Sequence, residues 1–262
     1  MQQTKVWYVT GASKGLGLSL VRKLIKRGYR VAATSRNIED LKQAVGEVPE
    51  GQFLPLAVDL TQAVSVQSSV SKAYEQFGQI DVAVNNAGYG IGGAVEELSQ
   101  KEIISNFEVN VFGPIHVIQS VLPYMRKERS GHIFNIASIA GFAPHMGWSV
   151  YAATKFSLMG LTEVLAQDVA SLGIKVTAVA PGGFRTQFNK ADTLVLSNCS
   201  WEVMLTGEHP RSWFNCMNNW KRTRISVSGL ILNKHYSAIC NDNSGSLRLL
   251  FSNLSPPLFS IS

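Results

Sequence analysis

Short apolar runs alternate along the first 180 residues with longer segments in which apolar residues recur every three or four positions. The first pattern is typical of buried β-strands and the second of amphipathic α-helices. The runs predict six strands, at residues 5–10, 29–34, 52–58, 80–84, 132–136 and 174–180. The periodic segments predict helices at residues 16–27, 38–45, 64–77, 103–126 and 150–172, with Pro114 placed to kink or split the fourth. This alternation predicts parallel crossovers and a doubly wound, three-layer α/β/α fold with a mostly parallel sheet.

The composition fits a globular α/β protein. Of the 262 residues, 45% are hydrophobic and 16% are charged, which allows a sizeable core. The sequence has no run of 18 apolar residues, so we expect no membrane span. Its first residues lead into an apolar run without a signal-peptide cleavage site, and we expect a cytoplasmic location.

The net charge of +6 does not indicate a nucleic-acid partner. Residues 1–192 carry 18 Lys and Arg against 15 Asp and Glu, residues 193–262 carry 6 against 3, and neither part has a dense basic run. A solvated surface explains this balance better than a nucleic-acid interface does. The cysteines Cys199, Cys216 and Cys240 follow no zinc-binding spacing, so we expect no metal site.

Doubly wound folds bind ligands at the carboxyl ends of their strands. The first predicted strand is followed by the glycine-rich residues 10–17, TGASKGLG, which open the first predicted helix. Glycines let the backbone approach a pyrophosphate, and the helix N-terminus offers it free N–H groups. The position of this loop favours dinucleotide binding over a plain turn.

The end of the second predicted strand bears on which dinucleotide is bound. A site that prefers NAD usually has an acid here for the ribose 2′-hydroxyl, but no acid precedes Glu39. Arg36 instead offers a guanidinium suited to a 2′-phosphate, and Lys14 lies in the neighbouring loop. We therefore expect NADP(H) in preference to NAD(H). An ordinary exposed arginine is the alternative interpretation of Arg36.

Three later strand ends carry further polar or small residues. Asp59 follows the third strand, where it can simply cap the next helix. Asn85-Asn86-Ala87-Gly88 follows the fourth, and suits a turn that a ligand can approach closely; a plain Asn-rich turn is the alternative. Pro181-Gly182-Gly183 follows the sixth.

The candidate chemistry lies after the fifth strand. Ser138 follows this strand, and Tyr151 and Lys155 are four residues apart in the next helix, on one face. A cation beside a phenol favours the phenolate, so we expect the pKa of Tyr151 to fall toward neutrality. Such a tyrosine can exchange a proton with a carbonyl or alcohol oxygen. A Tyr/Lys pair alone is usually incidental, but here it accompanies a nucleotide loop and Ser138.

Taken together, these motifs resemble the short-chain dehydrogenase/reductase family. The resemblance covers roughly residues 4–190. It is carried by TGASKGLG at 10–17, NNAG at 85–88, Ser138 with YAATK at 151–155, and PGGFRT at 181–186. It implies a single Rossmann-like domain that transfers a hydride between NAD(P)(H) and a carbonyl or alcohol.

The resemblance also implies residue roles. Tyr151 would be the general acid/base, Lys155 would bind the nicotinamide ribose and lower the pKa of Tyr151, and Ser138 would polarise the substrate oxygen. Asn110, in VNVFG, would hold a water of the proton relay; bonding to local backbone at a helix kink is the alternative. Asp59 would contact the adenine, Asn86 the adenosine side, and Pro181, Gly182 and Thr186 the nicotinamide end. The implied cofactor-binding set is Gly11, Ser13, Lys14, Gly15, Leu16, Gly17, Arg36, Asp59, Leu60, Asn86, Ala87, Gly88, Tyr151, Lys155, Pro181, Gly182 and Thr186.

Residues 193–262 depart from the family's pattern. They hold 12 Ser, 8 Asn and all three Cys, and no amphipathic helix of more than two turns stands out. Residues 225–232 and 247–252 can each form a strand. We interpret residues 1–192 as the catalytic domain and 193–262 as an atypical, irregular tail. Either this tail is an unusual folded substrate segment or it is an out-of-frame extension, which we favour.

The leading hypothesis is an NADP(H)-dependent oxidoreductase that acts on a small-molecule carbonyl or alcohol, with a tyrosine as general acid/base. The alternative is a related chain that binds the cofactor without turnover, as a damaged product or as a sensor or interaction module. Homo-oligomers are common in the family, but its usual interface strand is not recognisable here.

Overall fold

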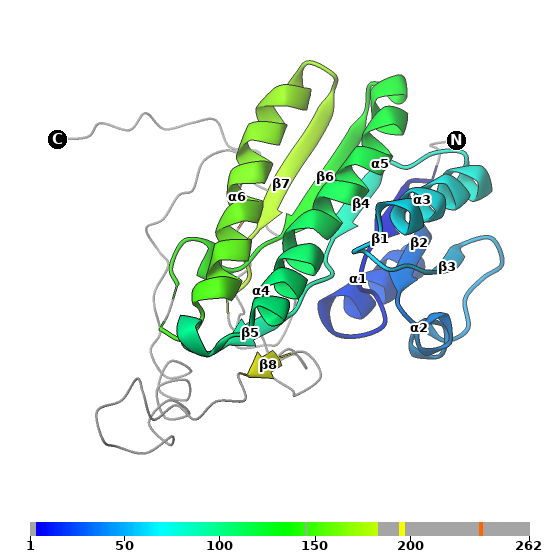
Figure 1. Cartoon of the computed structure of the whole chain (residues 1–262). Coiled ribbons are helices and arrows are strands. Elements are labelled where there is room, and N and C mark those ends of the chain that lie inside the picture. The colour runs from blue at the N-terminus through cyan, green and yellow to red at the C-terminus, as the bar shows by residue number, and fades with distance from the viewer. Residues whose placement is uncertain (1–3, 145, 183–193, 197–235, 238–262) are drawn as a thin grey trace.

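A parallel β-sheet forms the middle layer of the structure (Figure 1). The computed structural model describes residues 4–144, 146–182, 194–196 and 236–237. The strands of the main sheet are β1 (Val6–Val9), β2 (Arg30–Ser35), β3 (Phe53–Ala57), β4 (Val82–Asn85), β6 (Gly131–Ile136), β7 (Ile174–Val179) and β9 (Tyr236–Ser237). Their order is β3-β2-β1-β4-β6-β7-β9, and each neighbouring pair is parallel.

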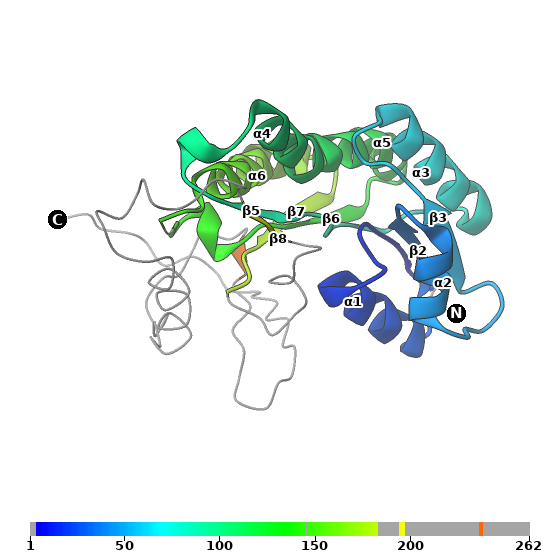
Figure 2. The same cartoon turned by 60° about the horizontal axis from the view of Figure 1, so that its bottom comes forward.

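Helices cover both faces of this sheet, as Figure 2 shows. The described α-helices are α1 (Gly15–Lys26), α2 (Ile38–Val45), α3 (Ala63–Phe77), α4 (Gln100–Phe107), α5 (Gly113–Glu128) and α6 (Ser149–Ala170). Helices α1 and α2 pack on one face, and α3, α5 and α6 on the other. Successive strand residues therefore enter different cores: Tyr8 packs on the α3 and α5 side and Val9 on the α1 side. The prediction of a doubly wound, three-layer fold is confirmed.

The strands lie close to the predicted positions. All six predicted strands are present, and their ends differ from the predicted ones by at most two residues. Pro55 is tolerated within β3 because this strand lies at the sheet edge. A small second sheet, of β5 (Gly90–Gly92) and β8 (Leu194–Leu196), was not predicted. The Gly-Ile-Gly segment of β5 has neither the length nor the β-branched content that marks a strand.

The predicted long helix at 103–126 is two helices joined by a π-helical turn. Helix α4 begins earlier than predicted, because the Ser99 and Glu102 side chains cap each other's backbone N–H groups. The π-helical turn (Glu108–Phe112) then separates α4 from α5. Pro114 lies in the first turn of α5, a position at which helices commonly accept proline. Pro114 therefore marks a helix start rather than a kink.

Several predictions concern residues that lie largely outside the described part of the chain. The domain boundary at 192 and the strands at 225–232 and 247–252 belong to this group, as do the three cysteines. Within the described residues, β9 pairs with Ala178 and Val179 of β7. No described helix is both long and apolar enough to cross a membrane. The described residues also contain no group of three or more His, Cys, Asp or Glu that can hold a metal ion.

Candidate active site

The glycine-rich loop between β1 and α1 depends on its glycines to pack closely against the loop that follows β4. Gly11 and Gly15 have φ of +65° and +59°, in the left-handed region that favours glycine. A Cβ at Gly11 would lie 2.7 Å from the Ala87 Cα, and one at Gly17 would collide with the Gly11 carbonyl and the Asn86 amide. Substituted side chains would therefore separate this loop from the loop that follows β4.

Asn86 and Thr10 hold these two loops together. The Asn86 Nδ2 donates to the carbonyls of Thr10 and Gly11, at 2.9 and 3.0 Å. The Thr10 Oγ1 accepts from the backbone N–H groups of Asn86 and Ala87, at 3.0 and 3.1 Å. The Asn86 amide thus faces the glycine-rich loop, and hydrogen bonds connect the loops that follow β1 and β4.

The N-terminus of α1 is suited to an anion. Lys14 is the N-cap residue, and its side chain does not cap the helix. The first turn contains no acidic residue. The first backbone N–H groups of a helix have no acceptor within the helix. Together with the positive end of the helix dipole, these N–H groups favour a phosphate at this position.

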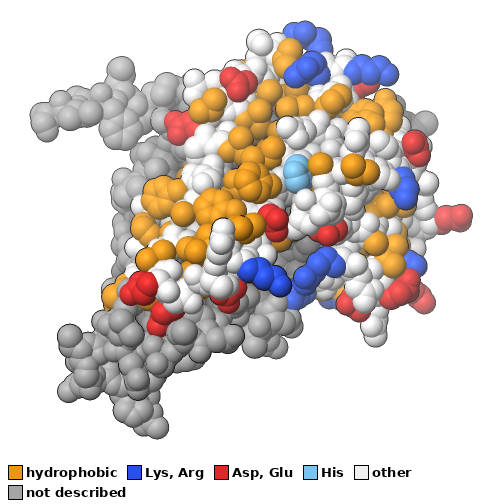
Figure 3. Space-filling model, viewed as in Figure 1, with side chains coloured by type: hydrophobic (Ala, Val, Ile, Leu, Met, Phe, Trp, Pro, Cys, Tyr) orange, Lys and Arg blue, Asp and Glu red, His pale blue; other side chains and the backbone are white. Residues whose placement is uncertain are grey.

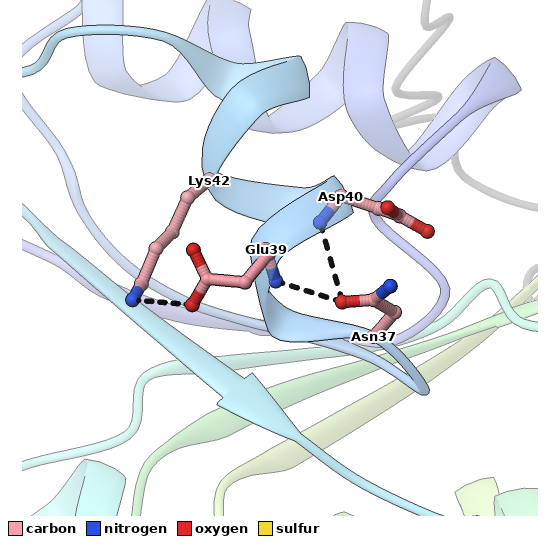
Figure 4. Close-up of polar contacts among 4 residues, drawn as sticks. All are labelled: Asn37, Glu39, Asp40 and Lys42. Carbon is pink, nitrogen blue, oxygen red and sulfur yellow. Dashed lines mark hydrogen bonds and ion pairs between the residues drawn. The ribbon is translucent and has the colours of Figure 1, made fainter.

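Arg36 is exposed just after β2, the strand that pairs with β1 and whose Thr34 carbonyl accepts from the Ala12 N–H of the glycine-rich loop. Asn37, the next residue, caps α2: its Oδ1 accepts from the N–H groups of Glu39 and Asp40, at 2.9 and 3.4 Å (Figure 4). The Glu39 carboxylate accepts from the Lys42 Nζ at 3.0 Å. The first acid after β2 therefore lies on the helix beside Lys42.

Asp59, at the end of β3, closes a turn on Thr61. Its Oδ1 accepts from the Thr61 N–H at 2.9 Å and from the Thr61 Oγ1 at 2.8 Å. The N-cap of α3 is Gln62, so the interpretation of Asp59 as that helix's cap is wrong. The adjacent Leu60 carbonyl accepts from the His116 Nδ1 at 3.0 Å, which places this turn against the start of α5.

Ser138, Tyr151 and Lys155 come together at the carboxyl end of β6. Tyr151 and Lys155 lie one turn apart on α6 and are almost fully buried, with 6% and 5% of their surfaces exposed. The Lys155 Nζ donates to the Ile136 carbonyl at 3.0 Å and lies 5.7 Å from the centroid of the Tyr151 ring. The Ser138 side chain hydrogen-bonds the Tyr151 hydroxyl. The predicted cluster is thus assembled.

Asn110 lies in the π-helical turn and faces the same cluster. Its Oδ1 accepts from the Tyr89 N–H at 3.1 Å, and its Nδ2 lies 3.0 Å from the Tyr89 carbonyl and 3.1 Å from the Thr154 Oγ1. A Cβ at Gly88 would meet the Asn110 Oδ1 at 3.0 Å and the Lys155 Nζ at 3.5 Å. The alternative interpretation of Asn110, as a side chain at a helix kink that bonds backbone, holds in part: Asn110 lies in the π-helical turn and bonds the backbone of Tyr89, which is 21 residues away and not local.

A family model described as short chain dehydrogenase matches residues 5–194 of this chain, a span that contains every described element of the cluster. The chain belongs to the short chain dehydrogenase family. The resemblance that the motifs indicated is therefore confirmed.

Curated relatives of this short chain dehydrogenase include oxidoreductases from a fungus and a bacterium. Oxidoreductase BOA17 of Botryotinia fuckeliana is 40% identical over 185 residues, which is 71% of this chain and 68% of the relative. The 3-ketodihydrosphingosine reductase of Bacteroides thetaiotaomicron is 39% identical over 188 residues, which is 71% of this chain and 66% of the relative. The similarity thus covers about two thirds of each relative.

Solved structures similar to this chain include complexes with NADP and with NADH. A short-chain dehydrogenase from Streptomyces avermitilis has a TM-score of 0.71 and 37% identity, over 76% of this chain and 73% of its own. A metagenomic short-chain oxidoreductase in complex with NADP has a TM-score of 0.63 and 32% identity, over 69% and 83%. A 3-ketoacyl-(acyl-carrier-protein) reductase from Brucella melitensis, complexed with NADH, has a TM-score of 0.69 and 27% identity, over 74% and 80%.

The electrostatics of the dehydrogenase cluster differ from the expectation. Burial raises the pKa of Tyr151 to about 12, and the hydrogen bond with Ser138 offsets this only in part. Burial also lowers the pKa of Lys155 to about 8. The expected fall in the pKa of Tyr151 is therefore wrong for the chain by itself, because desolvation by burial outweighs the hydrogen bond with Ser138.

Some residues at this site escaped the sequence analysis. The Thr154 hydroxyl accepts a hydrogen bond from the Asn110 Nδ2 and donates one to the Tyr151 carbonyl at 2.7 Å. A Cβ at Gly141 would lie 3.0 Å from the Lys155 carbonyl, so this glycine lets the segment after Ser138 pack on α6. Thr154 lies within the YAATK motif, which offered a signal, whereas Gly141 had none. Pro181 is buried and Gly182 is exposed after β7, and Thr186 lies outside the described residues.

Proposed function

We propose that this dehydrogenase transfers a hydride between NADP(H) and a small-molecule carbonyl or alcohol. One observation carries the proposal: the Ser138 and Tyr151 hydroxyls are hydrogen-bonded to each other, with the Lys155 Nζ buried behind them, at the carboxyl end of the sheet. Two hydroxyls converging beside a lysine suit a substrate oxygen that gains or loses a proton.

The chain's own residues fit a dinucleotide. Glycines at positions 11 and 17 let the glycine-rich loop pack against the loop that follows β4, because a Cβ at Gly11 would collide with Ala87 and one at Gly17 with Asn86. The N–H groups at the start of α1 would hold the pyrophosphate, and Lys155 the nicotinamide ribose. When bound, the nicotinamide supplies or accepts the hydride.

Tyr151 handles the proton and Ser138 orients the substrate oxygen. With a pKa raised to about 12, Tyr151 is protonated at neutral pH, which is the form that donates to a carbonyl oxygen. The Ser138 hydroxyl donates a hydrogen bond to the same oxygen. Asn110 fixes Tyr89 and Thr154 around the cluster, and the proton relay that the family resemblance implies would run along this side.

Arg36 and Lys14 support NADP(H) as the preferred cofactor. Arg36 is exposed at the end of β2, and the first acid that follows it in the sequence, Glu39, is paired with Lys42. A guanidinium is a strong partner for a phosphate, whereas a carboxylate at this position would repel one. Known complexes of related structures include both NADP and NADH, so the preference rests on these residues.

Substitution of Arg36 tests this preference. We expect Arg36→Ala to weaken NADPH binding about ten-fold and to change NADH binding less than two-fold, because only NADPH carries the 2′-phosphate; charge-assisted hydrogen bonds contribute roughly 1.5–3 kcal/mol. Fluorescence titration with both cofactors measures this, and Arg126→Ala, at an exposed position on α5, is the control. Equal losses for both cofactors would contradict the assignment of Arg36.

Turnover distinguishes this proposal from the alternative. NADPH binding is measured by fluorescence and NADPH consumption by absorbance, with a panel of aldehydes and ketones of increasing size. Binding with consumption of at least one carbonyl is expected. Binding without consumption across the panel would favour a cofactor-binding protein that performs no chemistry.

We also propose that a second copy of this chain packs on α5 and α6. Hydrophobic side chains gather along these helices in Figure 3, and Phe112, Phe156 and Val164 are 49%, 46% and 58% exposed. A Cβ at Gly160 would meet no atom, so a second helix can approach α6 closely there. A helix that is apolar on its outer face as well is usually covered, and a two-fold axis places such a face against itself.

Light scattering tests this interface. We expect the wild type to be a dimer, and Phe156→Glu to be a folded monomer, because a charge would be buried at the contact. Val64→Glu, on the exposed side of α3, should leave the dimer intact. A monomeric wild type would rule out this proposal. The cytoplasmic location stays a prediction from the sequence.

A further inference from the structure

Three buried polar side chains form a hydrogen-bonded chain beneath the Ser138, Tyr151 and Lys155 cluster. They are Asn85 on β4, Asn135 on β6 and Thr162 on α6, and their exposed fractions are 2%, 0% and 0%. The Asn85 Nδ2 donates to the Asn135 Oδ1 at 2.8 Å, and the Asn135 Nδ2 donates to the Thr162 Oγ1 at 2.8 Å. The Thr162 hydroxyl donates to the Leu158 carbonyl at 2.6 Å.

The direction of this chain is fixed from its helical end. A backbone carbonyl only accepts, so the Thr162 proton goes to Leu158, and the Thr162 oxygen must accept from the Asn135 amide. The Asn135 Oδ1 is then left to face Asn85, which must donate. The Asn85 Oδ1 accordingly has no hydrogen-bond donor among the described residues. Only one arrangement of the two amides satisfies Asn135 and Thr162 together.

The hydrogen bonds of Asn85, Asn135 and Thr162 join the three elements that make the candidate active site. Asn85 directly precedes the Asn86 to Gly88 loop, and Asn85 and Asn135 are paired across β4 and β6. Ile136, next to Asn135, supplies the carbonyl that receives the Lys155 Nζ. Thr162 lies two turns after Lys155 on the sheet-facing side of α6. Helix α6 therefore contacts β6 through polar links at two successive strand residues.

Apolar contacts alone define the position of α6 poorly. Its buried residues beyond the cluster include Leu158, Met159, Ala166 and Val169, and such contacts are non-directional. A small slide or rotation of the helix would move Tyr151 away from Ser138. A buried hydrogen bond with fixed donors and acceptors permits one register, as buried polar residues do in other packed helices.

We propose that Asn135 and Thr162, supported by Asn85, are positioning residues that set α6 against β6 so that Tyr151 and Lys155 reach Ser138 and the Ile136 carbonyl. None of the three touches the reacting atoms in this assignment. Its kinetic consequence rests on the proposed oxidoreductase function, whereas its structural consequence for Lys155 does not.

The kinetic test compares Thr162→Val with Thr162→Ser. Valine keeps the shape but leaves the Asn135 amide without its acceptor, whereas serine keeps the hydroxyl. We expect Thr162→Val to lower kcat about ten-fold, since small misplacements are costly in catalysis. The apparent pKa in its pH profile of kcat should move, the KM for NADPH should stay within about two-fold, and Thr162→Ser should restore the wild-type values. Thr177→Val, which removes a hydroxyl that hydrogen-bonds His132 at 2.9 Å, is the matched control.

A second test needs no turnover. Unfolding by urea is followed from about pH 7 to about pH 9 for the wild type and Thr162→Val, each with and without Lys155→Met. Burial of Lys155 makes stability rise with pH in this range. If Thr162 holds α6 in register, Thr162→Val exposes Lys155 to water and reduces the rise of stability with pH. In the Lys155→Met background, the wild type and Thr162→Val should then show the same dependence of stability on pH. If Thr162→Val does not fold, Thr162→Ala, which leaves room for water at the Asn135 amide, replaces it with the same expectations.

The outcomes separate the two claims. No turnover by the wild type would contradict the proposed function, and the unfolding test would still decide the positioning role. A lower melting temperature for Thr162→Val, with kcat, its pH profile and the Lys155-dependent rise all unchanged, would show a merely structural hydrogen bond. That result would overturn the positioning proposal while the function stood.

Discussion

Tyr151→Phe is expected to lower kcat for carbonyl reduction about 10³-fold, within the range that general acid–base catalysis contributes. The substitution removes only the hydroxyl that hydrogen-bonds Ser138, and the ring stays in its buried position beside Trp148. The dissociation constant for NADPH should change less than about two-fold, because no part of the glycine-rich loop is altered. Stopped-flow and steady-state kinetics measure the first quantity and fluorescence titration the second.

Tyr74→Phe is the matched control for this substitution. Tyr74 stacks on Tyr124 between α3 and α5, away from the cluster, and loses the same hydroxyl. Activity within about two-fold of wild type is expected for the control. If Tyr151→Phe also keeps its activity, another group donates the proton, and the assignment of Tyr151 is wrong.

Lys155→Met should abolish turnover and stabilise the chain in the absence of cofactor. Burial lowers the pKa of Lys155 from 10.5 to about 8, so the folded chain bears the cost of burying an ammonium group at neutral pH. At about 1.4 kcal/mol per pKa unit this cost is on the order of 3 kcal/mol, and the lost hydrogen bond to Ile136 offsets about 1 kcal/mol of the gain. A net gain of about 2 kcal/mol in the free energy of unfolding is expected.

The lowered pKa of Lys155 determines whether wild-type stability rises or falls with pH. Below about pH 8 Lys155 is protonated in both states, and its destabilising effect is complete. Above about pH 8 the folded chain releases the proton while the unfolded chain keeps it up to about pH 10.5, so wild-type stability rises with pH. Tyr151, with its raised pKa, acts in the opposite sense above about pH 10, so the comparison is made below that pH.

Urea unfolding at about pH 7 and about pH 9 measures the effect of Lys155→Met. The rise between the two pH values should disappear in this variant, and Lys72→Met, at an exposed position on α3, should retain it. Loss of stability in Lys155→Met at both pH values would mean that Lys155 is held charged by partners that outweigh its burial.

The sequence predicted the parts of this molecule that have a local signature. Strands and helices follow the spacing of apolar residues, and the pairing of Tyr151 with Lys155 follows from their separation by one helical turn. Gly11 and Gly17 were singled out because they lie in a glycine-rich segment between a predicted strand and a predicted helix, and in the structure a Cβ at either would collide with a neighbouring loop. In each case the information lies within a few consecutive residues.

What escaped prediction depends on contacts across the fold. Asn135 and Thr162 are 27 residues apart, and neither lies in a motif that marks it as polar and buried. The direction of the Tyr151 pKa shift depends on desolvation, which spacing does not reveal. The π-helical turn around Asn110 likewise has no marker beyond the Gly113-Pro114 pair that follows it.

Isotope transfer tests the central claim most directly. The enzyme is incubated with a carbonyl that it consumes and with NADPH carrying deuterium at C4 of the nicotinamide, and the alcohol product is examined by mass spectrometry. Use of one C4 epimer should place a single deuterium on the product carbon, and use of the other should place none. Tyr151→Phe should form almost no product from either epimer. Product without deuterium from both epimers, or NADPH binding without any product, would contradict hydride transfer at the Ser138, Tyr151 and Lys155 cluster.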